Sequence, residues 1–138
     1  MDNRTSLVVV ADMKQPPFRR DSFTTLFSYS TLPHVGSEAV VRHMIDLWDA
    51  LLVDGGTLFI GDIPDRHRLR AVVSRGFRKS SPTDSLKYFA AISMISYFSR
   101  ERLHHMLSNK NYDVTIMSQA GIRRFHDERF DLIARKRG

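Results

Sequence analysis

The sequence is defined first by what it lacks. None of its 138 residues is cysteine, which excludes disulfides, thiol nucleophiles and cysteine-ligated zinc or iron–sulfur sites. No apolar run approaches the ~20 residues that a membrane span needs. The apolar run at residues 7–11 is also shorter than the ~7 residues of a signal-peptide core. We therefore expect a cytoplasmic protein without a membrane partner.

Patterns typical of metal sites are absent as well. The six histidines form neither an H-x-x-x-H nor an H-E-x-x-H pattern, and those spacings are what place two imidazoles on one side of a helix. We therefore predict no metal site.

Positive charge is in excess but scattered. The formal net charge is +6, and the basic residues occur in short groups, such as Arg66, Arg68 and Arg70, separated by apolar residues. This spacing favours a solvated face and a charged tail, because no block is as long as a nucleic-acid-binding arm. We do not expect a nucleic-acid partner. A basic RNA-binding or RNA-modifying surface remains a lesser alternative.

The hydrophobic pattern predicts one α/β domain. Ser37 is a good N-cap for an amphipathic helix that runs to the Asp54-Gly55-Gly56 turn, and Ser99 caps another. Strands are expected over residues 7–12, 23–30, 57–63 and 112–119, and near 129–135. Alternation of strands and helices implies a mostly parallel sheet of about five strands. The two final strands, joined without a helix, imply one antiparallel strand near the C-terminus.

Several stretches, taken in order, resemble one enzyme family. "VVVADMKQPPFRRDSFTTLFSYSTLPHV" resembles the part of class I S-adenosylmethionine-dependent methyltransferases where an acid follows a strand and a later strand enters an L-x-H turn. "LLVDGGTLFIGDI" resembles their helix end and next strand. "SRERLHHMLSNKNYDVTIMSQ" and "RFDLIARKRG" resemble their last helix and closing hairpin. The resemblance covers nearly the whole chain and implies a partial Rossmann-like methyltransferase sheet.

The cofactor fingerprint of that family does not occur in the sequence. The family's G-x-G-x-G turn and its ribose-binding acid precede the region that the chain resembles. The only closely spaced glycines here are Gly55, Gly56 and Gly61, and the first two are expected to form a tight turn. We therefore interpret residues 1–138 as a single truncated domain, the C-terminal part only, with a helical insert at about residues 64–98.

The resemblance implies S-adenosylmethionine as the cofactor and assigns five residues to it. Asp12 matches an acid that accepts a hydrogen bond from the adenine amino group, and the Met13 N–H matches a group that reaches the ring. The alternative is that Asp12 caps its own backbone in a loop. Ser28, Tyr29 and Ser30 close the next strand and either contact the methionine part or the substrate, or form an ordinary strand end.

Two residues are candidates for the catalytic step. His34 is either a general base for a substrate hydroxyl or amine, or a surface histidine bonded to a turn carbonyl. Asp62 either orients or deprotonates the acceptor, or caps the insert behind Pro64. Methyl transfer occurs at an already activated carbon, so positioning alone supplies much of the rate. The aromatic residues of the insert form either core or an apolar lid over the acceptor: Tyr88, Phe89, Tyr97 and Phe98.

The resulting functional expectation is methyl transfer to a small-molecule acceptor, such as a saccharide or another metabolite. Without the glycine-rich turn, weak or no cofactor binding is expected from this chain alone. The alternative is a non-catalytic methyltransferase remnant or interaction module. In either case an uncovered sheet edge predicts self-association.

Overall fold

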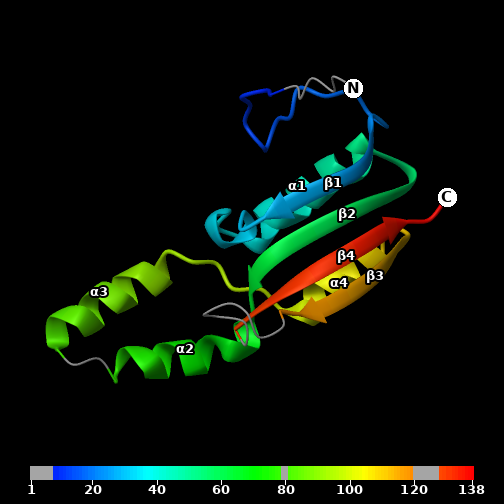
Figure 1. Ribbon diagram of the computed structural model, residues 1–138. Coiled ribbons are helices and arrows are strands. Elements are labelled where there is room, and N and C mark those ends of the chain that lie inside the picture. Colours follow the sequence, from blue (N-terminus) through cyan, green and yellow to red (C-terminus); the bar gives the residue numbers. More distant parts are fainter. Residues whose placement is uncertain (1–7, 79–80, 120–127) are drawn as a thin grey trace, which may run out of the picture.

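The computed structural model describes residues 8–78, 81–119 and 128–138 (Figure 1). Its sheet contains β1 (Phe23–Tyr29), β2 (Leu52–Pro64), β3 (Tyr112–Ser118) and β4 (Arg129–Lys136). Its helices are α1 (Glu38–Leu51), α2 (Leu69–Gly76), α3 (Pro82–Ser93) and α4 (Arg100–Ser108), with short 3-10 turns η1 (Leu32–His34) and η2 (Arg66–Arg68).

The four strands lie in the order β1-β2-β4-β3. β1 and β2 are parallel, whereas β4 runs antiparallel to both of its neighbours, β2 and β3. Three strands therefore point one way and only β4 points the other way. This arrangement confirms the mostly parallel α/β sheet with one antiparallel strand near the C-terminus, although the described residues form four strands where about five were expected.

Helix α1 follows its predicted start closely and ends earlier than predicted. The Ser37 side chain accepts a hydrogen bond from the Val40 N–H, which confirms the N-cap. The helix ends at Leu51 and β2 begins at Leu52, so the glycine turn does not terminate the helix. Gly55 instead takes a positive φ of 76° inside β2, where the pairing with β1 is irregular. The expected C-terminal cap is therefore a strand irregularity, which glycine alone accommodates without strain.

One face of the sheet carries the core. Helices α1 and α4 both lie behind the sheet in the view of Figure 1. The Ser99 cap of α4 is confirmed, because its side chain accepts a hydrogen bond from the Arg102 N–H. Strand residues facing these helices are completely or almost completely buried, among them Leu58, Ile60, Phe130, Leu132 and Ala134.

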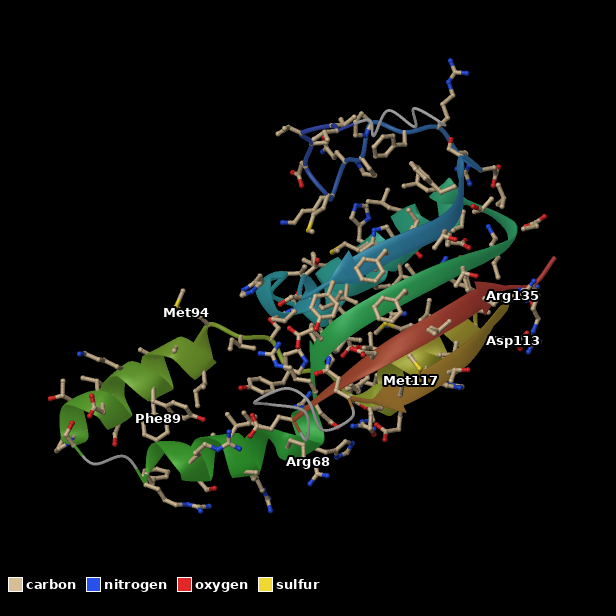
Figure 2. All side chains as sticks on the ribbon, in the orientation of Figure 1. Arg68, Phe89, Met94, Asp113, Met117 and Arg135 are labelled. Carbon is tan, nitrogen blue, oxygen red and sulfur yellow. The ribbon has the colours of Figure 1, made fainter. Side chains whose placement is uncertain are left out.

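The other face of the sheet is uncovered by any described helix. Figure 2 shows Asp113, Met117 and Arg135 on this face. Phe27 is 70% exposed here, and its ring stacks on that of Phe59 with centroids 4.8 Å apart. β1 also has no partner on its outer edge among the described strands. Within the described residues, the sheet therefore presents an aromatic patch beside charged residues, together with a free strand edge.

The segment before β1 corrects the sequence interpretation. The run from Val8 to Asp12 forms no strand, and Val8 and Val10 are 85% and 99% exposed. A β-branched run has strand propensity, but a strand requires a hydrogen-bonded neighbour, and no described residue pairs with this run. Residue 7 lies outside the described residues.

The insert forms a helical hairpin that extends away from the sheet (Figure 1). α2 and α3 both lie within the helical insert expected at about residues 64–98. The Tyr88 hydroxyl donates to the Val72 carbonyl at 2.9 Å and so ties one helix to the other. No helix within the described ranges is long and apolar enough to cross a membrane.

Candidate functional site

The carboxyl ends of β1 and β2 lie side by side and bring together four residues singled out from the sequence. Ser28 pairs with Ile60 and Tyr29 pairs with Gly61 in the parallel register. Ser30 and Asp62 follow directly, and both take a positive φ, of 53° and 62°. Such backbone strain in residues other than glycine clusters at functional sites. We take this edge as the candidate site.

The contacts of this edge explain Gly61. The Ser30 N–H donates to the Gly61 carbonyl at 3.0 Å, which joins the two strand ends. A Cβ on Gly61 would lie 2.5 Å from the Tyr29 ring and 2.7 Å from the Phe59 ring. Glycine is therefore required here for close packing of two aromatic rings, and it forms no phosphate cradle.

Asp62 belongs to a polar network with β4. One of its carboxylate oxygens accepts a hydrogen bond from the Arg129 guanidinium at 2.6 Å, and the Asp62 N–H donates to the Asp131 carboxylate at 2.8 Å. Gln119 donates to the same Asp131 oxygen at 2.8 Å. The other Asp62 oxygen has no hydrogen-bond partner in the described part of the chain, so it is free to accept a bond from a ligand.

This network was missed at the sequence level. Arg129 and Asp131 alternate with the buried Phe130 and Leu132 along β4. That alternation marked them as non-core residues. It gave no indication that they would meet Asp62, because the β2–β4 pairing breaks register between Ile60 and Ile63.

His34 ends the 3-10 turn that follows β1 and is exposed. Its N–H donates to the Thr31 carbonyl at 3.0 Å. The preceding residue, Pro33, accepts a hydrogen bond from the Ser96 N–H at 2.9 Å. The segment that leaves the helical hairpin is thereby attached beside the end of β1. No hydrogen bond joins the His34 ring to Asp62 in the described part of the chain, and the catalytic assignment of both residues stays a prediction.

The residue that caps the insert is Asp65, which the sequence analysis did not single out. Its side chain accepts from the His67 N–H at 2.9 Å and from Arg100 Nε at 2.7 Å, and the residue is only 3% exposed. Of the two roles weighed for Asp62, capping therefore falls to Asp65. This anchor fixes the hairpin relative to α4.

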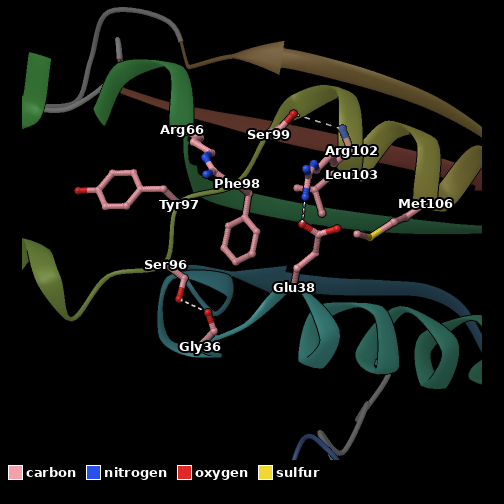
Figure 3. Close-up of a pocket in the computed structure, with 10 residues that line it drawn as sticks. All are labelled: Gly36, Glu38, Arg66, Ser96, Tyr97, Phe98, Ser99, Arg102, Leu103 and Met106. Atoms are coloured by element: carbon pink, nitrogen blue, oxygen red, sulfur yellow. Dashed lines mark hydrogen bonds and ion pairs between the residues drawn. The ribbon is translucent and has the colours of Figure 1, made fainter. Parts of the chain in front are cut away.

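A cavity of about 160 Å³ lies between the starts of α1 and α4 (Figure 3), and none of Ser28, Tyr29, Ser30 and Asp62 lines it. Residues from η2, the segment after α3, and the starts of α1 and α4 line it: Gly36, Glu38, Arg66, Ser96, Tyr97, Phe98, Ser99, Arg102, Leu103 and Met106. Arg102 donates to Glu38 at 2.7 Å across it. Burial raises the pKa of the half-buried Tyr97, with a smaller contribution from Tyr88, while Arg129 lowers it. Tyr97 therefore stays a neutral hydroxyl at physiological pH.

Asp12 and Met13 lie away from this cavity in the exposed N-terminal segment. The Asp12 carboxylate accepts a hydrogen bond from the Lys14 N–H at 2.9 Å, and its carbonyl accepts from the Gln15 N–H. This is the turn-capping arrangement that was weighed against adenine binding. The adenine role stays a prediction.

The described residues fit only part of a nucleoside-type cofactor. The edge at Ser28–Ser30 and Asp62 offers hydroxyl and carboxylate groups, but the described residues contain no G-x-G-x-G turn, and the adjacent Gly55 and Gly56 lie inside β2. Gly36 and Gly55, the glycines with positive φ, stand apart with open space around them. Among the described residues, no three His, Asp or Glu side chains are placed to hold a metal ion.

Comparison with known proteins gives matches at the level of structure only. No model of a protein family matches the sequence, and no curated protein matches it either. A methyltransferase structure from Methanosarcina mazei, described as S-adenosylmethionine-dependent, superposes with a TM-score of 0.64 and 14% identity over 94% of this chain. The N-methyltransferase NodS from Bradyrhizobium japonicum superposes with a TM-score of 0.58 at 16% identity over 94% of this chain. Magnesium protoporphyrin IX methyltransferase from Synechocystis, solved with S-adenosylhomocysteine, gives 0.61 at 14% identity over 91%.

The chain has a class I methyltransferase-like fold. It spans only part of each of these structures, namely 66% of the first, 59% of the second and 49% of the third. At such low identity the likeness concerns the methyltransferase-like fold alone. The resemblance noted in the sequence is thus confirmed at the level of fold.

Proposed function

We propose that this chain is the acceptor-side part of an S-adenosylmethionine-dependent methyltransferase that acts on a small molecule. The observation that carries the proposal is the pair of strained residues, Ser30 and Asp62, at adjacent carboxyl ends of parallel strands. Open α/β sheets bind ligands at such ends. The methyltransferase-like fold supports the same site.

In this proposal the chain positions the acceptor. The unengaged oxygen of Asp62 accepts a hydrogen bond from the acceptor's hydroxyl or amine, while Arg129 holds the other oxygen in place. Orientation of the attacking atom supplies much of the rate of a displacement reaction. S-adenosylmethionine, when bound, supplies the activated methyl group. His34 remains the candidate for accepting the proton that the acceptor loses.

The cofactor half is proposed to come from residues outside this chain. Support comes from the missing glycine-rich turn and from the unpaired outer edge of β1 in the described sheet. A saccharide or another metabolite as acceptor, and a cytoplasmic location, stay within this proposal.

The proposal is tested by formation of S-adenosylhomocysteine. The chain, together with any coding sequence that precedes Met1 in frame, is incubated with S-adenosylmethionine and a panel of small hydroxyl and amine compounds. We expect product formation that depends on the acceptor and falls at least tenfold in Asp62→Asn, the order of effect of one lost positioning contact. Asp84→Asn, on the exposed start of α3, is the matched control and should keep full activity. No product with any acceptor would contradict the proposal.

A second candidate is a non-catalytic interaction module. The uncovered face, with Phe27 stacked on Phe59, favours it, because apolar faces and free strand edges promote association. We propose self-association through this face. Sedimentation velocity should show a dimer or larger species that Phe27→Ser weakens. A clean monomer at high concentration would contradict this candidate.

A further inference from the structure

The helical hairpin contains cavities that the proposed function does not yet use. A cleft of about 420 Å³ lies between α2, α3 and the segment after α3. Its lining is almost entirely apolar and contains no charged residue: Leu69, Val73, Phe89, Ile92, Ser93, Ile95 and Tyr97. Small-molecule sites have volumes of roughly 300–1,000 Å³ and mostly apolar walls. The cleft has the size and the walls of such a site, whereas the cavity of about 160 Å³ beside it holds only a small group.

The cleft is continuous with positively charged surface. Tyr97 lines both the cleft and the small cavity. Leu69 and Val73 line both the cleft and a groove along α2, which also includes Arg66 and Arg70. Arg66 in turn lines the small cavity as well as the groove. Shared residues thus connect the apolar cleft to Arg66 and Arg70.

Most of the positive charge of this region forms no ion pair with a described residue, although Arg75 pairs with Glu128. Residues 66–93 contain seven lysines and arginines and one aspartate, a difference of +6, equal to the net charge of the whole chain. Arg66 and Arg70 form no ion pair with any described residue. The one carboxylate at the small cavity, Glu38, is already bound by Arg102 at 2.7 Å and approached by Arg42 at 3.8 Å. An incoming anion would therefore meet an unpaired guanidinium.

We propose that the hairpin binds the acceptor, and that this acceptor is an apolar small molecule carrying one anionic group. The apolar body occupies the cleft between α2 and α3. A carboxylate or phosphate is held by Arg66 at the mouth of the small cavity. A planar guanidinium binds both kinds of group through paired N–H donors.

The placement also connects this site with the strand ends. Tyr97 lies at the junction of cleft and cavity. Its chain neighbours are bonded near the strand ends, because the Ser96 N–H donates to the Pro33 carbonyl after β1 and the Phe98 N–H donates to the Pro64 carbonyl at the end of β2, each at 2.9 Å. A bound acceptor can therefore extend from the hairpin toward the edge where the proposed function places the reacting atom. The inference rests on the proposed function for the role of the ligand, but its test does not require the cofactor.

The test compares two ligands of the same shape. 1-Naphthoate and its neutral counterpart 1-naphthamide are titrated into the 138-residue chain at low salt, by calorimetry and two-dimensional NMR. Both should shift resonances of Val73 and Ile92, and naphthoate should bind about fivefold more tightly, the size expected for an accessible ion pair. Arg66→Gln should remove the difference. Arg68→Gln is the matched control, because Arg68 lies in the same turn (Figure 2) and lines none of these cavities.

Several results would overturn the inference. Equal binding of the two ligands, binding of neither, or an unchanged preference in Arg66→Gln would each do so. The ligand comparison on the unmodified chain stands even if a variant does not fold. Binding of phosphatidylglycerol vesicles without binding of naphthoate would identify a membrane contact and would also contradict it. Naphthoate binding without any methyl transfer would refute the proposed function and leave this site intact.

Discussion

Replacement of Asp65 by asparagine tests the anchor of the helical hairpin. The change keeps the size of the side chain and an oxygen for the His67 N–H, but it removes the negative charge that faces Arg100. The Asp65 side chain is 4% exposed and that of Arg100 28% exposed. Loss of one partner of a fully buried pair costs about 3–5 kcal/mol.

Partial hydration of Arg100 reduces this cost. We therefore expect the free energy of unfolding to fall by about 2–3 kcal/mol, out of the ~5–15 kcal/mol typical of a domain. The assay is urea denaturation followed by circular dichroism at neutral pH. Glu38→Gln is the matched control, because it breaks the exposed pair with Arg102 and should cost less than about 1 kcal/mol. A loss in Asp65→Asn no greater than in this control would refute the reasoning.

Three further changes test other parts of the fold. Gly61→Ala should lower the free energy of unfolding by about 1–3 kcal/mol, because the new methyl group overlaps the Tyr29 ring; thermal unfolding identical to that of the parent chain would contradict this. Tyr112 is buried and donates to Asp49 at 2.9 Å, and burial, followed by this hydrogen bond, raises its pKa above 10. The stability that the neutral Tyr112 hydroxyl contributes is therefore complete below pH ~10 and is lost as the pH rises through the folded-state pKa. An absorbance titration of Tyr112→Phe should lack the tyrosine ionisation that occurs at the highest pH in the parent chain. Ser37→Ala should lower the free energy of unfolding by about 1 kcal/mol, because it removes the N-cap of α1. Ser93→Ala, at the C-terminal end of α3, should lower it by less in the same denaturation assay.

The sequence predicted the helices that its own N-caps and apolar spacing encode. The three- and four-residue spacing of Val41, Met44 and Ile45 placed α1 correctly, because one helical face meets the sheet. The run at residues 8–12 gave a wrong strand for the opposite reason. Strand propensity is a property of a segment, but strand formation depends on a partner that lies elsewhere.

The site was predicted only in outline. Ser28–Ser30 and Asp62 were singled out because they lie at or after the ends of strands in a parallel sheet, and their roles stay predictions. The Asp62–Arg129 pair joins residues 67 positions apart, and its geometry depends on an irregularity in the β2–β4 pairing. The positive φ of Ser30 has no sequence signal either, since serine rarely adopts it.

The most direct test of the account is calorimetric titration with S-adenosylmethionine. We predict no binding in the micromolar range by the 138-residue chain, because each cofactor group left buried without a partner costs about 1–3 kcal/mol, and every 1.4 kcal/mol is about a tenfold loss of affinity. The chain extended by in-frame residues that supply a glycine-rich turn should bind at micromolar concentration. Tight binding by the 138-residue chain alone, abolished by Asp12→Ala, would contradict the central claim.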